Sequence, residues 1–364
     1  MYSMAMSFRL PPSGIKGRGA LSNPANRFDK AHVEAVDDGW FYDEPPESIQ
    51  TQLIIDRSRS VIARNDSPDI VFEQSINPYR GCSHGCIFCY ARPTHAFLGM
   101  SPGLDFETRL VYKPDAAAVL REELSRPGYR CKFIMLGSNT DPYQPVERQL
   151  GITRSILEVL AEARHPVAIT TRSALLLRDL DLLAQMAEGR LVSVVMSMTT
   201  LDSDLKRKLE PRSASAAARL HAIRALREAG VPVGVLAAPI IPAVNDSELE
   251  AILERVAEAG ATEAGYVLLR LPLEVADLFR QWLQTHMPDR ADHVMSLVQG
   301  TRGGHDNTAK FGERMRGTGV WAQLLRDRFR LACRRLGLST GRRVELDTTQ
   351  FRPPSRGGQL NMGF

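Results

Sequence analysis

The most restrictive stretch of this 364-residue chain reads Gly81-Cys82-Ser83-His84-Gly85-Cys86-Ile87-Phe88-Cys89-Tyr90. Its three cysteines have the spacing C-x3-C-x2-C, and an aromatic residue directly follows the last of them. Thiolates are the soft ligands that iron–sulfur clusters select, and three of them can hold three irons of a [4Fe–4S] cluster. The motif has no fourth cysteine, so one iron would stay open to a substrate or cofactor. Its glycines suit a loop that must approach such a cluster closely.

Zinc is the main alternative occupant, because C-x2-C pairs often bind zinc and His84 or His95 could supply a fourth ligand. A zinc site usually has a second ligand pair further along the chain. The sequence shows none, since Cys131 and Cys333 stand alone. A disulfide fits poorly with three cysteines inside eight residues. The spacing therefore favours an iron–sulfur cluster over zinc and over a disulfide.

The composition favours a globular enzyme over a membrane or secreted protein. Lys and Arg number 46 and Asp and Glu 42, which gives a formal net charge of +4. Met1–Gly19 lacks the apolar core of a signal peptide. The most apolar run, Val231–Val244, is too short to span a bilayer and contains Pro239 and Pro242. We expect a cytoplasmic protein that makes no contact with a membrane, in a compartment that keeps thiols reduced.

Short apolar runs alternate with longer amphipathic ones from residue 75 onward, which is typical of strand–helix units with a parallel sheet. A doubly wound open sheet would satisfy the same pattern. Polar motifs fall at the C-terminal ends of the expected strands, where barrel sites assemble, and this favours an α/β fold of the partial (β/α)6 barrel type. The strands are expected at Ser75–Arg80, Lys132–Ser138, Pro166–Thr171, Leu191–Met198, Pro232–Ile241 and Glu263–Leu271, and the helices at Asp115–Leu124, Thr153–Ala163, Leu177–Gly189, Ala214–Ala229, Ser247–Ala259 and Leu273–His286.

The chain divides into four expected regions. Residues 1–70 form an N-terminal extension that is partly disordered. Residues 71–290 form the partial barrel. Residues 291–346 form a basic helical extension, with a helix at Val320–Leu336, and residues 347–364 form a flexible tail.

The cysteine motif resembles the signature of the radical S-adenosylmethionine (radical SAM) enzymes. Two further strings, Thr140-Asp141-Pro142-Tyr143-Gln144-Pro145-Val146-Glu147 and Leu209-Glu210-Pro211-Arg212, are similar to those of the spore-photoproduct-lyase-like branch. Members of this branch carry the label "DNA repair photolyase", and the similarity covers about residues 75–271. Arg18–Pro24, together with the late string Phe311-Gly312-Glu313-Arg314-Met315-Arg316-Gly317, resembles an uncharacterised bacterial subgroup of this branch.

The resemblance implies a set of cofactors and ligands. Cys82, Cys86 and Cys89 would bind the [4Fe–4S] cluster. S-adenosylmethionine would bind at the open iron and be cleaved reductively to a 5′-deoxyadenosyl radical. His84 would lie near the cluster without ligating it. The implied activity is that of a radical enzyme, a lyase or a modifying enzyme, whose substrate no motif identifies.

The same resemblance implies contacts with S-adenosylmethionine after the second expected strand. Ser138, Thr140 and Asp141 stand where the family binds the methionyl amine. Small, hydroxyl and carboxylate side chains suit a ligand that carries an ammonium group. The alternative is structural, because Asp141 followed by Pro142 can open a turn that Thr140 caps.

Further contacts are expected from three other segments. Arg172 follows the third expected strand and suits the methionyl carboxylate through its bidentate fork, unless it is a plain surface arginine. Ser197 would hydrogen-bond the ribose. Tyr90 would present backbone groups to the adenine. Glu210 either fixes this rim of the barrel or forms a buried ion pair at a helix entry.

One position departs from the spore-photoproduct-lyase pattern. The lyase has a cysteine directly before the Thr-Asp pair, and that cysteine donates a hydrogen atom to the product radical. Here the residue is Asn139, and an amide N–H bond is far too strong to replace a thiol. Cys131 lies at the other end of the same strand. We therefore expect a substrate other than spore photoproduct.

Two classes of substrate stay open. The first is DNA or another nucleic acid, bound through the basic C-terminal region, and the second is a peptide or small molecule with no nucleic-acid role. Gln359–Phe364 loosely resembles the peptides that dock on bacterial sliding clamps. An electron donor such as flavodoxin or ferredoxin is expected from the chemistry. The arginines that could neutralise phosphates are Arg326, Arg328, Arg330, Arg334, Arg335, Arg342 and Arg343.

Overall fold

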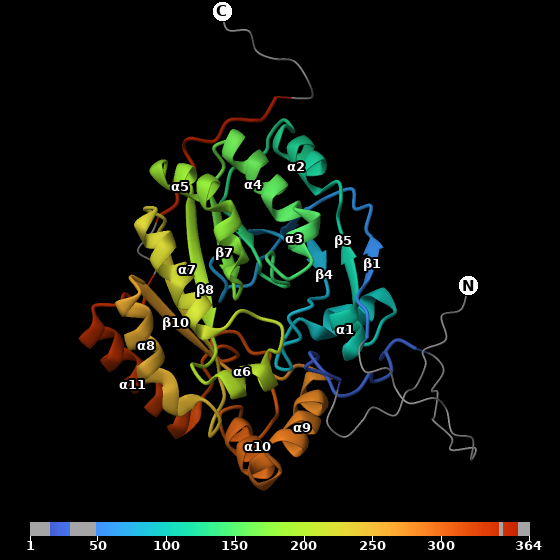
Figure 1. The fold of residues 1–364 in the computed structure, drawn as a ribbon, viewed down its shortest axis with the longest axis vertical. Helices are drawn as coiled ribbons and strands as arrows, with labels where there is room; N and C mark the ends of the chain where they lie inside the picture. The colour runs from blue at the N-terminus through green and yellow to red at the C-terminus, as the bar shows by residue number, and fades with distance from the viewer. Residues whose placement is uncertain (1–14, 30–48, 342–344, 356–364) are drawn as a thin grey trace, which may run out of the picture.

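A curved sheet of seven strands, in the order β10-β9-β8-β7-β6-β3-β2, forms the centre of the molecule (Figure 1). The computed structural model describes residues 15–29, 49–341 and 345–355. Neighbouring strands from β3 to β10 pair in parallel, and β2 adds an antiparallel edge. The strands are β2 (Ile62–Arg64), β3 (Gln74–Ile76), β6 (Ile134–Leu136), β7 (Val167–Thr171), β8 (Val192–Met198), β9 (Val233–Ile240) and β10 (Glu263–Leu268).

Amphipathic helices connect the parallel strands and cover the outer face of the sheet (Figure 1). In the helix before β9, Ser215 caps the first turn by accepting the Ala218 N–H, and Gly230, with a φ of +77°, follows its end. This arrangement is a partial (β/α)6 barrel, so the expected fold class is confirmed. Within the described residues, none of the helices has both the length and the apolar composition needed to cross a bilayer. The connecting helices are α2 (Ala116–Leu124), α3 (Glu147–Leu150), α4 (Ile152–Glu162), α5 (Leu180–Glu188), α6 (Ser203–Leu209), α7 (Ala216–Glu228) and α8 (Leu249–Glu258).

The first expected strand, Ser75–Arg80, is divided between two sheets. Its beginning is β3 of the barrel, whereas β4 (Tyr79–Arg80) pairs with β5 in a second sheet of order β1-β5-β4. Pro78 stands between them and has no amide hydrogen with which to continue a ladder. The second sheet also contains β1 (Gln52–Ile55) and β5 (Arg109–Tyr112), and α1 (Leu104–Thr108) precedes β5.

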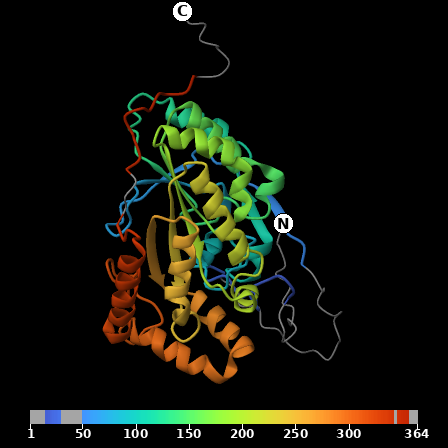
Figure 2. The same ribbon diagram turned by 60° about the vertical axis from the view of Figure 1, so that its left-hand side comes forward.

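The C-terminal region packs against the last strand of the barrel. Helices α9 (Val275–His286) and α10 (Ala291–Gly300) follow β10, and α11 (Gly319–Leu336) lies beside β10 and α8 (Figure 2). Phe329 of α11 is buried and packs against Tyr266 of β10, with ring centres 4.8 Å apart and the ring planes tilted by 55°. The expected basic helix is therefore present, but one of its faces belongs to the core.

The beginning of the expected flexible tail is bound to the barrel. The Phe351 ring lies 5.4 Å from the Tyr129 ring and 5.3 Å from the His165 ring. The Arg352 N–H donates to the Ala163 carbonyl at 2.9 Å. Asp347 and Gln350 add polar contacts with Arg190 and Arg164. All of these partners are distant in sequence, which is why composition alone suggested a free tail. The expected sliding-clamp peptide, Gln359–Phe364, lies outside the described residues.

Candidate functional site

The cysteine loop, residues 81–90, lies between β4 and the short 3-10 helix Arg92–Leu98. Two of its thiols are buried and the third is half-buried. Gly81 and Gly85 have φ angles of +79° and +71°, in the left-handed region that residues with a Cβ rarely adopt. Glycine at these two positions permits the sharp changes of direction that a loop wrapped around a cluster needs.

The three thiols are close enough to influence one another's ionisation. Burial raises the pKa of Cys82 to about 12, and the charge of Cys89 contributes to the rise. Burial also raises the pKa of Cys86 well above its usual value, although the charge of Arg172 opposes this. Thiolates in such a place need a cationic partner, which the irons of a cluster would provide. Three soft donors in one loop are the ligand type of the expected [4Fe–4S] cluster, whose binding stays a prediction.

Gln144 holds the cysteine loop in place, a role that the sequence analysis did not assign. Its side chain is fully buried. Its Oε1 accepts the Ser83 N–H at 2.9 Å, and its Nε2 donates to the Gly81 carbonyl at 3.2 Å. A glutamine provides both a donor and an acceptor, so it can bind two backbone groups of one loop. Its position between two prolines of the Thr140–Glu147 string was the only signal available.

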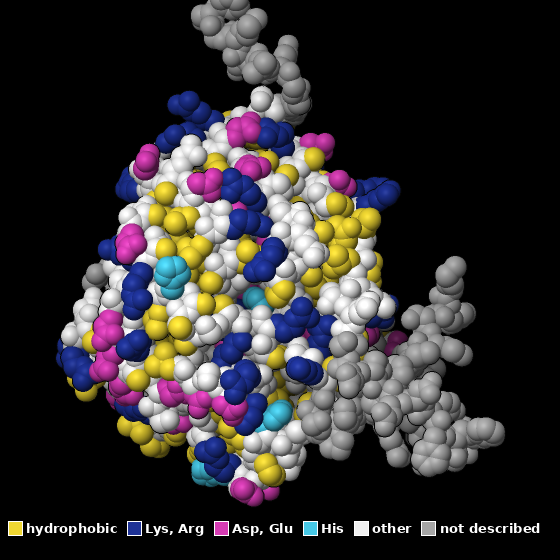
Figure 3. Space-filling view, viewed as in Figure 1, with side chains coloured by type: hydrophobic (Ala, Val, Ile, Leu, Met, Phe, Trp, Pro, Cys, Tyr) yellow, Lys and Arg dark blue, Asp and Glu magenta, His cyan; other side chains and the backbone are white. Residues whose placement is uncertain are grey.

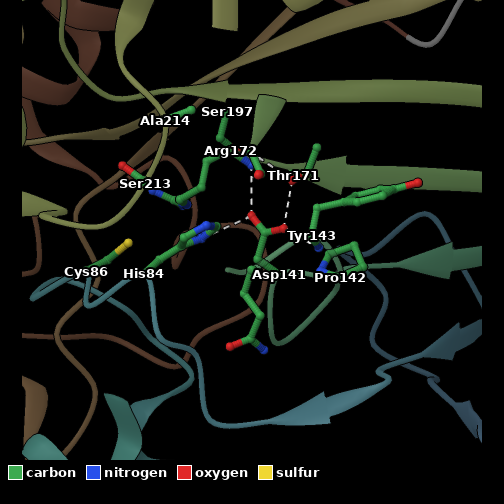
Figure 4. A network of polar contacts seen from close by, with 12 residues as sticks. His84, Cys86, Asp141, Pro142, Tyr143, Thr171, Arg172, Ser197, Ser213 and Ala214 are labelled. Atoms are coloured by element: carbon green, nitrogen blue, oxygen red, sulfur yellow. Dashed lines mark hydrogen bonds and ion pairs between the residues drawn. The ribbon is translucent and has the colours of Figure 1, made fainter. Parts of the chain in front are cut away.

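Asp141 joins the cysteine loop to the end of β7 (Figure 4). Its carboxylate accepts the Thr171 hydroxyl at 2.7 Å and the Arg172 backbone N–H at 2.9 Å. Its Oδ2 lies 3.4 Å from Nδ1 of His84, whose pKa burial lowers to about 4. The carboxylate that we expected at the methionyl amine is thus already engaged by donors of the protein.

Glu210 is the second carboxylate beside the loop, and it is completely buried. It accepts from Arg172 Nη1 at 2.6 Å and also binds the Arg219 guanidinium, so the buried ion pair considered from the sequence is present. Its Oε2 lies 4.0 Å from the Cys86 sulfur. Burial lowers the pKa of Arg172, but the charges of Cys86 and Glu210 outweigh this and raise it. Arg172 therefore remains a cation next to the cysteine loop.

The Leu209–Arg212 string also binds the cysteine loop through its backbone. The Ile87 N–H donates to the Leu209 carbonyl at 3.0 Å, and the Arg212 N–H donates to the His84 carbonyl at 3.1 Å. The two strings that carried the family resemblance therefore converge on the cysteine motif. Chain segments far apart in the sequence fix the loop from two sides.

The other expected cofactor contacts lie around the same loop. The Tyr90 hydroxyl donates to the Ser138 carbonyl, and 45% of Tyr90 is exposed. Thr140 is buried and donates to the Tyr79 carbonyl at 2.7 Å, so it has a structural role. Ser197 is buried at the end of β8 (Figure 4). The structure thus brings these residues to one edge of the sheet, and their contacts with S-adenosylmethionine remain predictions.

Glu107 on α1 supports the loop from behind, another role that the sequence analysis missed. Its buried carboxylate accepts the N–H groups of Gly19 and Ala20, at 3.0 and 2.8 Å. It also forms an ion pair with Arg92. Arg92 in turn donates to the Cys86 carbonyl at 3.0 Å. A Cβ atom on Gly19 would lie 1.8 Å from the Gly85 oxygen, so this contact requires glycine. Part of the N-terminal extension is therefore bound against the cysteine loop.

A partial barrel with a three-cysteine loop at the C-terminal edge of its strands defines an α/β protein suited to an iron–sulfur cluster. Residues 76–256 match the family model described as the radical SAM superfamily. An uncharacterised protein of Mycobacterium tuberculosis is 41% identical over 230 residues, which cover 63% of this chain and 68% of that protein. An uncharacterised protein of Methanocaldococcus jannaschii is 27% identical over 214 residues, or 59% and 76% of the two chains. The chain belongs to the radical SAM superfamily.

The fold also resembles that of spore photoproduct lyase. A solved structure of this lyase, in complex with dinucleoside spore photoproduct, gives a TM-score of 0.57 at 16% identity. The match covers 79% of this chain and 81% of the lyase. The predicted likeness to the lyase is thereby confirmed at the level of the fold.

Proposed function

We propose that this protein is a radical SAM enzyme that binds a [4Fe–4S] cluster through Cys82, Cys86 and Cys89 and S-adenosylmethionine at the remaining iron. The observation that carries the proposal is the convergence of two separate strings on the buried cysteine loop. When bound, the cluster supplies the electron for reductive cleavage of S-adenosylmethionine to methionine and a 5′-deoxyadenosyl radical. Membership of the superfamily supports this chemistry.

The residues around the loop would orient the cofactor. Glu210 engages one side of the Arg172 guanidinium, whose remaining N–H groups suit the methionyl carboxylate. Asp141 already accepts from Thr171 and the Arg172 backbone, so we assign it to positioning this edge instead of to the methionyl amine. Ser138 and Tyr90 would contribute backbone and side-chain contacts on the other side of the loop.

We further propose that the substrate is a nucleic acid. The fold is similar to that of a lyase solved with a dinucleoside photoproduct, and this similarity supports a substrate of related chemistry. Asn139 stands where the family pattern has its hydrogen-donating cysteine, so the reaction would differ from repair of spore photoproduct. The alternative is a peptide or small-molecule substrate.

The basic helix α11 would contribute less to nucleic-acid binding than its sequence suggests. Arg328 binds the Glu250 carboxylate at 2.8 and 2.7 Å, and Arg335 pairs with Glu254. Arginines paired with carboxylates of α8 are partly neutralised and held in place. In Figure 3, basic and acidic side chains are interspersed over the visible face. Phosphate contacts are therefore better sought at the barrel itself.

The test is formation of 5′-deoxyadenosine after anaerobic reconstitution with iron, sulfide and a strong reductant. The native chain should produce 5′-deoxyadenosine from S-adenosylmethionine, and Cys86→Ala should lose both the cluster and the product. Cys131→Ala is the matched control, because this thiol is half-buried outside the loop. Product formation by Cys86→Ala at the native rate would refute the assignment.

A further inference from the structure

Arg270 has no direct ion-pair partner among the described residues, although the charge of Asp69 acts on it. It follows β10 at the edge of the sheet, and its Nε is buried without a hydrogen-bond partner. The one acceptor found near its guanidinium is the Met315 sulfur, 3.7 Å from Nη1, and no described carboxylate forms an ion pair with it. The buried arginines Arg92 and Arg219, in contrast, each pair with a buried glutamate. Arg270 as a whole is half-buried, but its Nε is shielded from water without a partner, and an unpaired buried N–H is unfavourable, so this position suits an incoming anion.

The neighbours of Arg270 add to the excess of positive charge. Burial lowers the pKa of Arg270 and the charge of Arg314 adds to this, while Tyr90 and Asp69 act in the opposite direction. Arg270 in turn contributes to lowering the pKa of Arg302. Asp69 neutralises Arg314 through a two-point ion pair, and Arg302 donates to backbone carbonyls. The Nε of Arg302 is unpaired as well, but among these three arginines Arg270 is the one that has neither a carboxylate nor a carbonyl partner within the described residues.

Tyr90 connects Arg270 to the candidate cofactor site. The Arg270 guanidinium lies 5.2 Å from the centre of the Tyr90 ring. Tyr90 directly follows the last cysteine of the loop, and its hydroxyl reaches the Ser138 carbonyl after β6. Tyr90 as a residue is 45% exposed, so a ligand can reach it. A cation beside an accessible aromatic ring is the combination with which proteins bind the phosphate and the base of a nucleotide.

We propose that Arg270 and Tyr90 form the substrate-anchoring site of this enzyme, with Arg270 binding a nucleotide phosphate and Tyr90 contacting the adjoining base. This inference rests on the proposed function and specifies where its substrate is held. The phosphate belongs either to a nucleic-acid strand or to a free nucleotide, because both present the same oxyanion to a guanidinium. A substrate anchored here would lie beside the cysteine loop, at the edge where the radical is generated.

The experiment measures binding of a fluorescein-labelled single-stranded 12-nucleotide DNA to the reconstituted protein by fluorescence anisotropy, at low and at physiological salt. Arg270→Gln should weaken binding about tenfold, which corresponds to about 1.4 kcal/mol. Arg270→Lys should recover part of the affinity, because it restores the charge but not the planar fork. Arg224→Gln on α7 is the matched control, since it removes an exposed arginine remote in sequence from this edge.

Competition identifies the source of the phosphate. If only unlabelled DNA displaces the labelled strand, the natural ligand of the site is a nucleic-acid strand. If thymidine 5′-monophosphate also displaces it, the natural ligand is a free nucleotide. A tetraglutamate peptide that displaces the strand more strongly than either would overturn the assignment to phosphate. If Arg270→Gln binds the labelled DNA as tightly as the native chain does, the proposed anchoring site is wrong, even if the native chain forms 5′-deoxyadenosine. Absence of 5′-deoxyadenosine from the native chain would instead count against the proposed function, so the two failures are distinguishable.

Discussion

At the scale of single residues, buried carboxylates hold the candidate site from two sides. Glu210 lies in front, between two arginines and within 4.0 Å of the Cys86 sulfur, and Glu107 lies behind the loop with Arg92. A buried ion pair contributes little net stability compared with apolar residues, but removing one partner leaves an uncompensated charge. These carboxylates therefore fix the geometry of the cysteine loop. Substituting either of them would lower the stability of the protein, because a buried charge would lose its partner.

Glu107→Gln tests the support behind the loop. It removes the charge that faces Arg92 while keeping the size of the side chain, so we expect a loss of about 3 kcal/mol in the free energy of unfolding. Urea unfolding followed by circular dichroism measures it, and iron content after reconstitution should fall as well. Glu122→Gln, an exposed carboxylate on α2, is the control and should leave the unfolding midpoint in place. A Glu107→Gln protein as stable as this control would contradict the role assigned to Glu107.

The buried His165 makes the free energy of unfolding depend on pH. Burial lowers the pKa of this histidine to about 4, so the folded chain resists a proton that the unfolded chain takes up near pH 6.5. Stability contributed by the neutral ring is complete above pH 6.5 and is lost as the pH falls towards 4, by at most about 1.4 kcal/mol per pH unit. Urea midpoints between pH 7 and 4.5 should show a shallower slope for His165→Gln than for the native chain. Equal slopes would mean that His165 does not contribute.

Prediction from sequence was most successful where a residue's chemistry is specific to one ligand. The cysteine spacing pointed to the loop, and the expected strand ends placed Asp141 and Arg172 beside it, while their contacts with a cofactor stay a prediction. The sequence did not reveal which protein groups bind these two side chains. The contacts Asp141–His84 and Arg172–Glu210 join segments that are distant in the sequence. Gln144 was missed for the same reason.

At the scale of elements, strand–helix alternation was predictable because each unit carries its own periodicity. The division of Ser75–Arg80 into β3 and β4 was not, since it depends on pairing with β5, which the sequence analysis did not recognise as a strand. Helix α11 was expected as a basic extension. Its position against β10 depends on which face of it meets Tyr266, and this requires the assembled fold.

Phe329→Ala tests whether α11 is part of the core. Phe329 is 2% exposed, so we expect the free energy of unfolding to fall by about 3 to 5 kcal/mol. Leu331→Ala on the same helix is the control, because Leu331 is 64% exposed and should change stability by less than about 0.5 kcal/mol. Urea denaturation of the two variants compares them directly. Similar small losses in both would mean that α11 is a detachable extension.

At the scale of the whole molecule, the open side of the barrel is bridged by the chain before α11. The Leu268 N–H of β10 donates to the Met315 carbonyl at 2.9 Å, so this segment runs along the edge of the sheet. Arg314 then binds Asp69, which belongs to the connection between β2 and β3 at the opposite edge. The two edges of the sheet are thereby linked beside the proposed Arg270 anchor, and substrate access and sheet closure involve the same segment.

The central claim is that the three thiols of one loop bind an iron–sulfur cluster. The most direct measurement is iron, zinc and acid-labile sulfide content per chain, with the visible absorption spectrum, on protein purified and reconstituted without oxygen. The native chain should contain about four irons and about four sulfides and be brown. Stoichiometric zinc in a colourless protein that takes up no iron would contradict the account.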